Sequence, residues 1–286
     1  MTKNFSKSIK AKLLNMARNN GLDYQVLLTR FLYERLLYRL AVSRFKEKFC
    51  LKGGALLYAF EKEFSRPTLD IDLLGLKIKN DASLLIRIFT EIMSIPYEND
   101  GVVFDTNSLK TENIAENKAY NGIRILFIAH LDSIRQRLQI DIGFGDVLIP
   151  EAQLLPYPVL IRDLPVPDIL AYSLETVVAE KFHAMLDLAE SNSRHKDFYD
   201  IYRILSQNEL NEKHLIDAIR ATFNNRKMIF KENHPLFTQS FYEDKNRQIM
   251  WKAFLRKIKY AENLEFSDVM KCITERLYPI YHEISK

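Results

Sequence analysis

Lys52-Gly53-Gly54-Ala55-Leu56, Arg66-Pro67-Thr68-Leu69-Asp70-Ile71-Asp72-Leu73 and Leu138-Gln139-Ile140-Asp141-Ile142-Gly143 are the stretches that decide the fold. In the second and third stretches, aspartates alternate with Ile and Leu, which is typical of a strand with one buried face. Side chains two residues apart on a strand point to the same face, so we expect Asp70 and Asp72 side by side. Asp141 on a neighbouring strand would complete a carboxylate site for divalent cations.

The aspartate pattern also has a plainer interpretation. Two aspartates one residue apart arise by chance in a chain of this size, and such a pair could be two solvated acids on an exposed strand face. The apolar neighbours favour the metal site, because two carboxylates on one face of a half-buried strand repel each other unless a cation neutralises them. Asp141 could instead serve the turn at Gly143 and Gly145, and Asp146 competes with it as third ligand.

The glycine pair Gly53-Gly54 precedes a short helical segment over 55–60. Glycine lets a ligand approach the backbone closely, and the N–H groups at a helix start attract anions. The pair therefore indicates a phosphate-binding turn. Glycine pairs are common, so this signal is weak in isolation.

Periodicity along the chain predicts an α+β fold with a mixed sheet, an N-terminal helical arm and a C-terminal helical domain. The predicted helices are 8–49 with a break at Gly21, 55–60, 82–93, 174–189 with Ser173 as N-cap, 196–205, 212–223, 246–258 and 266–278. The predicted strands are 68–76, 102–109, 119–130 and 136–142, and a Pro-rich linker covers 156–167. The expected domains are an arm over 1–48, a core over 49–160 and a helical domain over 161–286.

Composition points to a globular protein with an uneven charge distribution. The 286 residues are 47% hydrophobic and carry a net charge of +4, divided into +8 over 1–50, −8 over 51–210 and +4 over 211–286. The basic flanks could hold a polyanion, or their lysines and arginines could simply solvate helix faces. Neither a membrane-length apolar run nor a signal-peptide core is present, so the expected compartment is the cytoplasm. The two cysteines, Cys50 and Cys272, indicate neither a disulfide framework nor a zinc site.

A second group of charged residues lies in the helical half. Lys181 falls on an apolar helix stripe, where an ammonium needs an anion unless it reaches solvent. Asp197 shares an apolar stripe of the next helix and is the expected partner or site residue, whereas Asp200 is expected to point elsewhere. Arg194 precedes Asp197 by about one turn and could join it.

In order, these motifs resemble the AbiEii-type nucleotidyl transferase toxins of the polymerase-β-like superfamily, over roughly residues 45–205. The residues that carry the resemblance are Lys52-Gly53-Gly54-Ala55-Leu56, Arg66-x-Thr68-x-Asp70-Ile71-Asp72, Asp141, Glu175-x4-Glu180-Lys181 and Arg194-x-Lys196-Asp197-x-Tyr199-Asp200. The ordered set is more specific than any single motif.

The resemblance implies a polymerase-β-like core and a toxin of a type IV toxin–antitoxin or abortive-infection module. Such toxins use Mg²⁺, in a two-metal site, and a nucleoside triphosphate, and some extend the 3′ end of tRNA. The implied partners are a nucleoside triphosphate, RNA and an antitoxin encoded upstream, with no membrane.

The resemblance also assigns roles to individual residues. Gly53, Gly54, Arg66, Thr68 and Lys181 are implied to bind the nucleotide. The implied metal ligands are Asp70, Asp72 and Asp141, and the implied catalytic residues are these three with Lys181 and Asp197. Gly54 stands where the wider superfamily often has serine, so a backbone N–H must replace a hydroxyl contact. The third carboxylate is less firmly placed in this branch of the superfamily.

The leading hypothesis is therefore Mg²⁺-dependent transfer of a nucleotide to RNA. A second hypothesis keeps the site but makes a protein hydroxyl the acceptor. A third is a catalytically inactive nucleotide-binding module that acts through protein contacts. The closely spaced aspartates disfavour the third, because a decayed site has no reason to keep carboxylates that repel one another.

Overall fold

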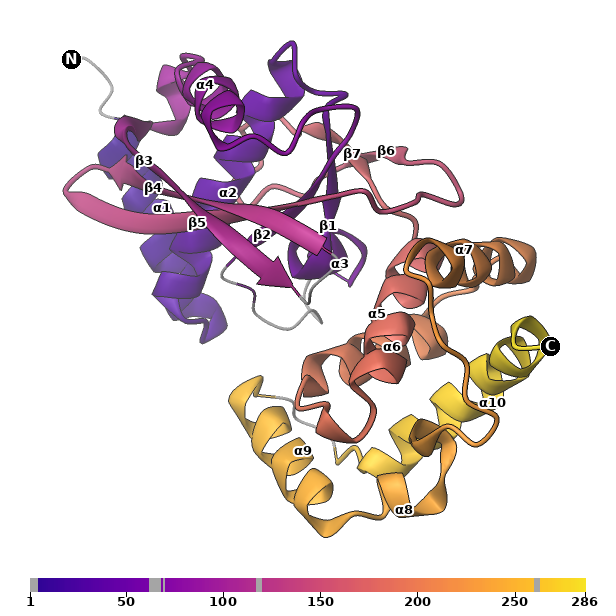
Figure 1. Ribbon diagram of the computed structural model, residues 1–286. Helices are drawn as coiled ribbons and strands as arrows, with labels where there is room; N and C mark the ends of the chain where they lie inside the picture. Colours follow the sequence, from indigo (N-terminus) through magenta and orange to yellow (C-terminus); the bar gives the residue numbers. More distant parts are fainter. Residues whose placement is uncertain (1–4, 62–67, 69, 117–119, 260–262) are drawn as a thin grey trace. The chain divides into compact units, whose positions relative to one another are not determined.

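The computed structural model describes residues 5–61, 68, 70–116, 120–259 and 263–286 (Figure 1). The chain forms two compact units, which are described separately. Unit 1 contains residues 1–145 and 152–172, and unit 2 contains residues 146–151 and 173–286. The three-domain division expected at 48/49 and 160/161 stays a prediction.

Unit 1 is built on a seven-stranded mixed sheet with the strand order β3-β4-β5-β2-β1-β7-β6. Its elements are α1 (Phe5–Asn20), α2 (Tyr24–Val42), β1 (Phe49–Lys52), α3 (Gly53–Glu61), β2 (Ile71–Gly75), α4 (Ala82–Met93), η2 (Glu98–Asp100), β3 (Val102–Glu116), β4 (Tyr120–Leu131), β5 (Ile134–Phe144), β6 (Gln153–Pro156) and β7 (Asp168–Ala171). The pairs β2–β5 and β1–β7 are parallel, and the other neighbours are antiparallel. The predicted α+β class is confirmed.

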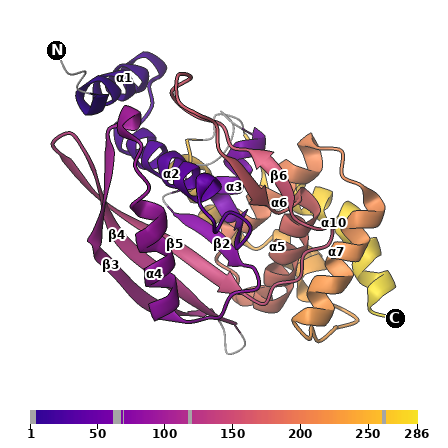
Figure 2. The ribbon, with the colours of Figure 1, turned by 90° about the horizontal axis from the view of Figure 1, so that it is seen from above.

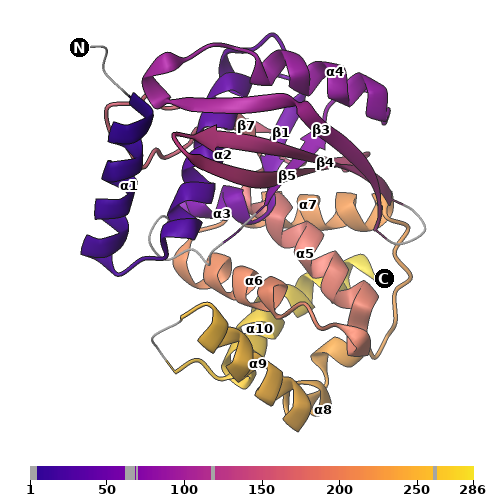
Figure 3. The same cartoon turned by 90° about the vertical axis from the view of Figure 1, so that its left-hand side faces the viewer.

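Alternation along the central strands separates the core from the opposite face of the sheet. Ile125 on β4, Ile140 on β5 and Ile71 on β2 lie side by side and are buried. Helix α4 contacts β3 and packs Phe89 edge-on against Phe49 of β1, so it covers this apolar face (Figure 2). Helix α2 packs against α4, and α1 lies beside α2 (Figure 3). The other face of the sheet carries the charged residues.

A buried ion pair fixes α2 to the start of β3. Arg39 Nη1 donates to Asp100 Oδ2 at 2.8 Å and to the carbonyl oxygen of Arg35 at 3.0 Å. Asp100 also accepts a hydrogen bond from the backbone N–H of Val102 at 2.9 Å. Because a buried ion pair is tolerated only when its hydrogen bonds are satisfied, this network sets where α2 lies on the sheet.

Three short strands were absent from the prediction. Strand β1 is almost wholly buried and therefore lacks the alternation that marks a half-buried strand. Strands β6 and β7 flank the Pro-rich segment, and Pro156 closes β6 at the edge of the sheet, where its missing N–H costs no ladder bond. The hairpin of β3 and β4 is longer than predicted on the β3 side and contains a register shift between Asp105 and Lys110.

Unit 2 is helical. Its elements are α5 (Leu174–Leu188), η3 (Ala189–Ser191), α6 (His195–Gln207), α7 (Glu212–Asn225), η4 (Pro235–Phe237), α8 (Gln239–Tyr242), α9 (Lys245–Lys257) and α10 (Phe266–Ile284). The predicted cap of α5 is confirmed, since Ser173 Oγ accepts from the backbone N–H of Thr176 at 3.1 Å. Aromatic side chains, among them Phe182, Phe198 and Trp251, fill the core. Within the described residues, none of the helices has the length and apolar character that crossing a bilayer requires.

A buried acid of unit 1 gives stability a pH dependence. Glu34 on α2 is fully buried, lies 3.6 Å from Arg30 Nε and accepts hydrogen bonds from the backbone N–H of Leu160 at 3.0 and 3.1 Å. Burial raises the pKa of Glu34 from 4.5 to about 7, despite the opposing effect of Arg30. The folded state therefore binds this proton more tightly than the unfolded state does.

We predict that wild type loses about 3 kcal/mol of unfolding free energy relative to Glu34→Gln as pH rises from about 4.5 to 7. A folded-state pKa above the unfolded value contributes stability at low pH and loses it as the pH rises. Glutamine keeps an oxygen acceptor for the N–H of Leu160. Urea unfolding of both proteins between pH 4.5 and 8 measures the difference, and stability curves that stay parallel would contradict the prediction.

Candidate active site

Three carboxylates converge on the charged face of the sheet in unit 1. One oxygen from each of Asp70, Asp72 and Asp141 lies within 4.8 Å of the other two, and all three residues are half-buried. Asp72 on β2 is directly opposite Asp141 on β5. Asp70 comes just before β2, where Thr68 Oγ1 donates to its Oδ1 at 2.6 Å. The predicted convergence is confirmed. The structure also places the Thr68 hydroxyl against this carboxylate.

The three carboxylates fit a divalent cation by their chemistry. Carboxylate oxygens are the hard ligands that Mg²⁺ takes from proteins, commonly together with substrate phosphates. Like charges this close also repel one another unless a cation lies between them. Asp70, Asp72 and Asp141 are therefore the residues that could hold a metal. The competing candidate, Asp146, belongs to unit 2 and pairs with Arg226 at 2.9 Å.

An arginine that the sequence reasoning missed pairs with the third carboxylate. Arg124 on β4 lies opposite Asp141, with Nε 2.7 Å from Oδ1 and Nη2 2.7 Å from Oδ2. This side-chain hydrogen bonding raises the pKa of Arg124 above its ordinary value, although burial acts in the other direction. The sequence signal was an arginine at an alternating position of an otherwise apolar strand.

A buried tyrosine supports the strand next to the carboxylates. Strand β2 pairs with β5 only from Ile140 onward. At the preceding residue of β5, Gln139, the hydroxyl of Tyr33 donates to the carbonyl oxygen at 2.8 Å and accepts from the backbone N–H at 3.1 Å. Burial raises the pKa of Tyr33, and the three nearby carboxylates add to the effect. Tyr33 thus supplies hydrogen bonds to β5 just before the point where β2 begins to pair with it.

Gly53 forms the turn between β1 and α3 and touches the acidic group. Its φ is +69°, and a Cβ built there would overlap Asp72 Oδ2 and lie 2.7 Å from Asp72 Cγ. A residue with a Cβ would therefore be strained here and would have to displace the Asp72 carboxylate. Gly54 lies in the first turn of α3, a nine-residue helix. Arg66, the remaining predicted phosphate ligand of this region, lies outside the described residues.

The predicted lysine and aspartates of unit 2 form a compact buried cluster. Lys181 Nζ lies 2.7 Å from Asp197 Oδ1, and Arg194 Nε lies 2.8 Å from Asp197 Oδ2. The expectation that Asp200 points elsewhere is wrong, because its Oδ2 lies 2.8 Å from Lys181 Nζ. Residues three apart on a helix are neighbours on its surface, so Asp197 and Asp200 can reach one cation.

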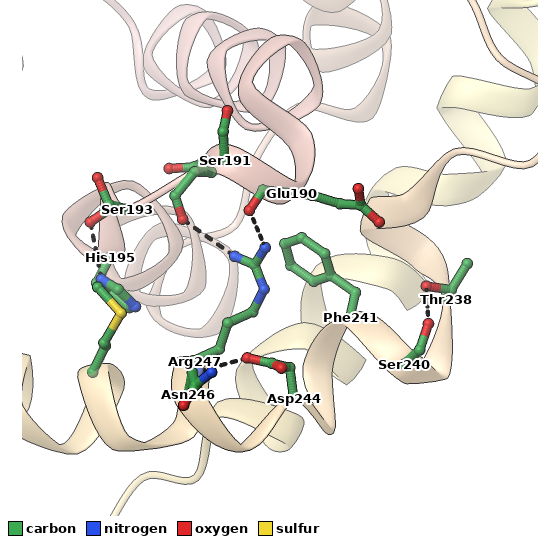
Figure 4. Close-up of a pocket in the computed structure, with 12 residues that line it drawn as sticks. Glu190, Ser191, Ser193, His195, Thr238, Ser240, Phe241, Asp244, Asn246 and Arg247 are labelled. Carbon is green, nitrogen blue, oxygen red and sulfur yellow. Dashed lines mark hydrogen bonds between the residues drawn. The ribbon is translucent and has the colours of Figure 1, made fainter.

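A hollow of about 480 Å³ in unit 2 is lined by an arginine whose guanidinium is hydrogen-bonded to backbone carbonyls (Figure 4). Arg247 Nη2 donates to the carbonyl of Glu190 at 2.5 Å, Nη1 donates to that of Asn192 at 3.2 Å, and the guanidinium lies 3.9 Å from the Phe241 ring centre. Asp244 caps α9 by accepting from the N–H of Arg247 at 2.8 Å. The guanidinium therefore connects α9 to the segment that contains η3, and its hydrogen bonds are used within unit 2.

Solved structures resemble this fold over most of its length. JHP933 from Helicobacter pylori is 15% identical with a TM-score of 0.51, covering 92% of this chain and 94% of that one. A second Helicobacter pylori protein, whose description as a nucleotidyltransferase is provisional, has 15% identity and a TM-score of 0.47 over 92% and 96% of the two chains. An antigenic nucleotidyltransferase-like protein from Paracoccidioides brasiliensis has 12% identity and a TM-score of 0.39 over 86% and 97%. Only the first supports a shared fold.

Among curated proteins, none matches this sequence. The family described as "Nucleotidyl transferase AbiEii toxin, Type IV TA system" matches residues 35–272, which is most of the chain and includes both charged clusters. The chain therefore belongs to the AbiEii family and is a nucleotidyltransferase toxin of a type IV toxin–antitoxin system.

Proposed function

We propose that this protein is a Mg²⁺-dependent enzyme that transfers a nucleotide from a nucleoside triphosphate to RNA, with the 3′ end of tRNA as acceptor. The observation that carries the proposal is the convergence of three carboxylates within 4.8 Å beside the turn at Gly53. The same turn begins α3, whose first N–H groups suit the phosphates of a nucleotide. The carboxylates that would bind the cation and the N–H groups that would bind the phosphates are thereby neighbours.

The acidic group would hold the metal through Asp70, Asp72 and Asp141. When bound, Mg²⁺ supplies positive charge for the phosphate oxygens and orients them for in-line displacement. The acceptor hydroxyl oxygen forms a bond to the α-phosphorus, the bond from that phosphorus to the bridging oxygen breaks, and pyrophosphate leaves. Asp141 accepts the hydroxyl proton, because each carboxylate oxygen has a second lone pair beyond the one directed at Arg124.

We propose that Lys181 contacts the nucleotide and that Asp197 is its partner. A lysine ammonium has three donors, so its ion pairs with Asp197 and Asp200 are compatible with a contact to a phosphate oxygen. These ion pairs hold the ammonium of Lys181 in one place, and Arg194 is a second cation paired with Asp197. In this proposal, Asp197 positions the lysine.

The RNA acceptor is supported by the basic flanks 3–48 and 226–259. Two of the N-terminal lysines form surface ion pairs, Lys10 with Asp132 and Lys12 with Asp163, both at 2.9 Å. Surface pairs contribute little stability, so phosphate groups can replace the acidic partners at low cost. The proposed protein partner is an antitoxin encoded upstream.

Incubation with each α-³²P-labelled nucleoside triphosphate, together with deacylated tRNA, total RNA or total protein, tests the proposal. We expect label in tRNA, with a product one or more nucleotides longer on a sequencing gel and loss of labelling in EDTA. Label confined to the protein fraction would replace the RNA acceptor by a protein hydroxyl. Absence of label in every fraction would favour the inactive nucleotide-binding module.

We predict that Asp70→Asn and Asp72→Asn each lower nucleotide transfer by at least about a hundredfold, since loss of a metal ligand removes several kcal/mol of charge stabilisation. Asp163→Asn is the matched control, because it removes the same charge from an exposed pair of unit 1. It should retain transfer. Thermal unfolding should show that all three variants fold, and a folded, fully active Asp72→Asn would contradict the assignment.

We predict that Gly53→Ala abolishes transfer, whereas Gly21→Ala only lowers stability. Both glycines have positive φ, +69° and +63°, so alanine costs about 1–2 kcal/mol of unfolding free energy at either position. A Cβ at Gly21 meets nothing within 4 Å, whereas one at Gly53 overlaps the Asp72 carboxylate. Transfer rates and melting temperatures of the two variants separate backbone strain from displacement of Asp72, and equal transfer rates would contradict the role of Gly53.

A further inference from the structure

One row of charged residues crosses five strands of unit 1. The strand register places Lys52, Asp72, Asp141, Arg124 and Glu112 opposite one another in succession, on β1, β2, β5, β4 and β3. The signs alternate except at the centre, where the two acids are adjacent. Like charges directly opposite each other destabilise a sheet, and opposite charges stabilise it.

The arginine of this row, Arg124, pairs with Asp141 in a way that still allows Asp141 to bind a cation. Arg124 donates to both oxygens of Asp141 at 2.7 Å, a bidentate geometry that fixes the plane of the carboxylate. Each carboxylate oxygen has about two lone-pair sites, so the pairing leaves acceptor capacity for a cation. The side chains of Arg124 and Asp141 are 33% and 19% exposed, and water can therefore reach the pair.

We propose that Arg124 is a positioning residue that acts as the built-in counter-ion of the acidic group, a role that rests on the proposed metal-dependent function. It holds Asp141 beside Asp72 before a divalent cation enters. Its positive charge also opposes that cation, so the protein alone binds divalent metal weakly. Nucleotide phosphates then supply the negative charge that brings the metal to full occupancy.

Arg124→Gln separates this role from a purely structural cross-strand pair. Removing the opposing charge should strengthen Mn²⁺ binding without nucleotide by about tenfold, because one unit charge at short range changes cation affinity even after solvent screening. Arg124→Lys keeps the charge and should bind Mn²⁺ with nearly the affinity of wild type. Arg137→Gln is the matched control on the same face of β5, four residues and roughly 13 Å from Asp141, and should leave Mn²⁺ affinity unchanged.

Melting temperatures in EDTA and in saturating Mn²⁺ give a readout independent of activity. We expect Arg124→Gln to melt below wild type in EDTA and to recover in Mn²⁺, which takes over the neutralising charge. The double variant Arg124→Gln/Asp141→Asn should regain the lost melting temperature in EDTA, because it removes the uncompensated acid. This comparison needs neither metal nor nucleotide.

Two outcomes would overturn the inference: weaker or unchanged Mn²⁺ affinity in Arg124→Gln, or a double variant that melts no higher than Arg124→Gln in EDTA. Calorimetric titration with Mn²⁺ and the melting curves decide both. The proposed function fails differently, through absence of labelled product in wild type with Mg²⁺ and all four nucleoside triphosphates. A counter-ion effect in EDTA together with absent transfer would retain the role of Arg124 and reject the enzyme activity.

Discussion

The repulsion between Asp72 and Asp141 is the constraint on which the site depends. The parallel register of β2 and β5 sets these two acids directly opposite each other, where like charges are unfavourable. The sheet places a cationic residue on each side of them, Lys52 on β1 and Arg124 on β4. Because side chains alternate between faces, this charged row leaves the apolar face intact for α2 and α4. The same strand register thus places the apolar core on one face of the sheet and the charged site on the other.

The turn at Gly53 depends on the same acids. A side chain there would displace the Asp72 carboxylate, so the helix α3 can begin beside the acidic group only from glycine. This closeness brings the N–H groups of a helix start, which attract anions, next to carboxylates that attract cations. A bound metal–phosphate complex satisfies both attractions at once, which supports the choice of a nucleoside triphosphate as substrate.

The sequence predicted the parts that depend on local periodicity. Alternation around Asp72 and Asp141 predicted their strands, and the convergence of both with Asp70 was also predicted, although the predicted strand 68–76 is shorter in the structure and Asp70 precedes β2. Ser173 marked a helix start. The pairing of Arg124 with Asp141 depends on the register of β4 on β5, which joins residues 17 apart and is not encoded in either strand alone. Short buried strands such as β1 carry no alternation to detect. The contact between Asp200 and Lys181 was missed because the hydrophobic pattern assigned Asp197 and Asp200 to different faces of the helix. Residues three apart on a helix are neighbours, so both acids can reach the same lysine.

The two charged clusters differ in what they can exchange. In unit 2, Lys181 pairs with Asp197 and Asp200, whose side chains are 0% and 2% exposed, so loss of either partner would leave a charge buried and unpaired. The carboxylates of unit 1 are half-buried, and their cationic neighbours are partly in water. Partners of partly solvated charges exchange at low cost. A step in which a cation arrives and leaves therefore belongs to unit 1, whereas the cluster of unit 2 fixes the position of Lys181 before any ligand binds.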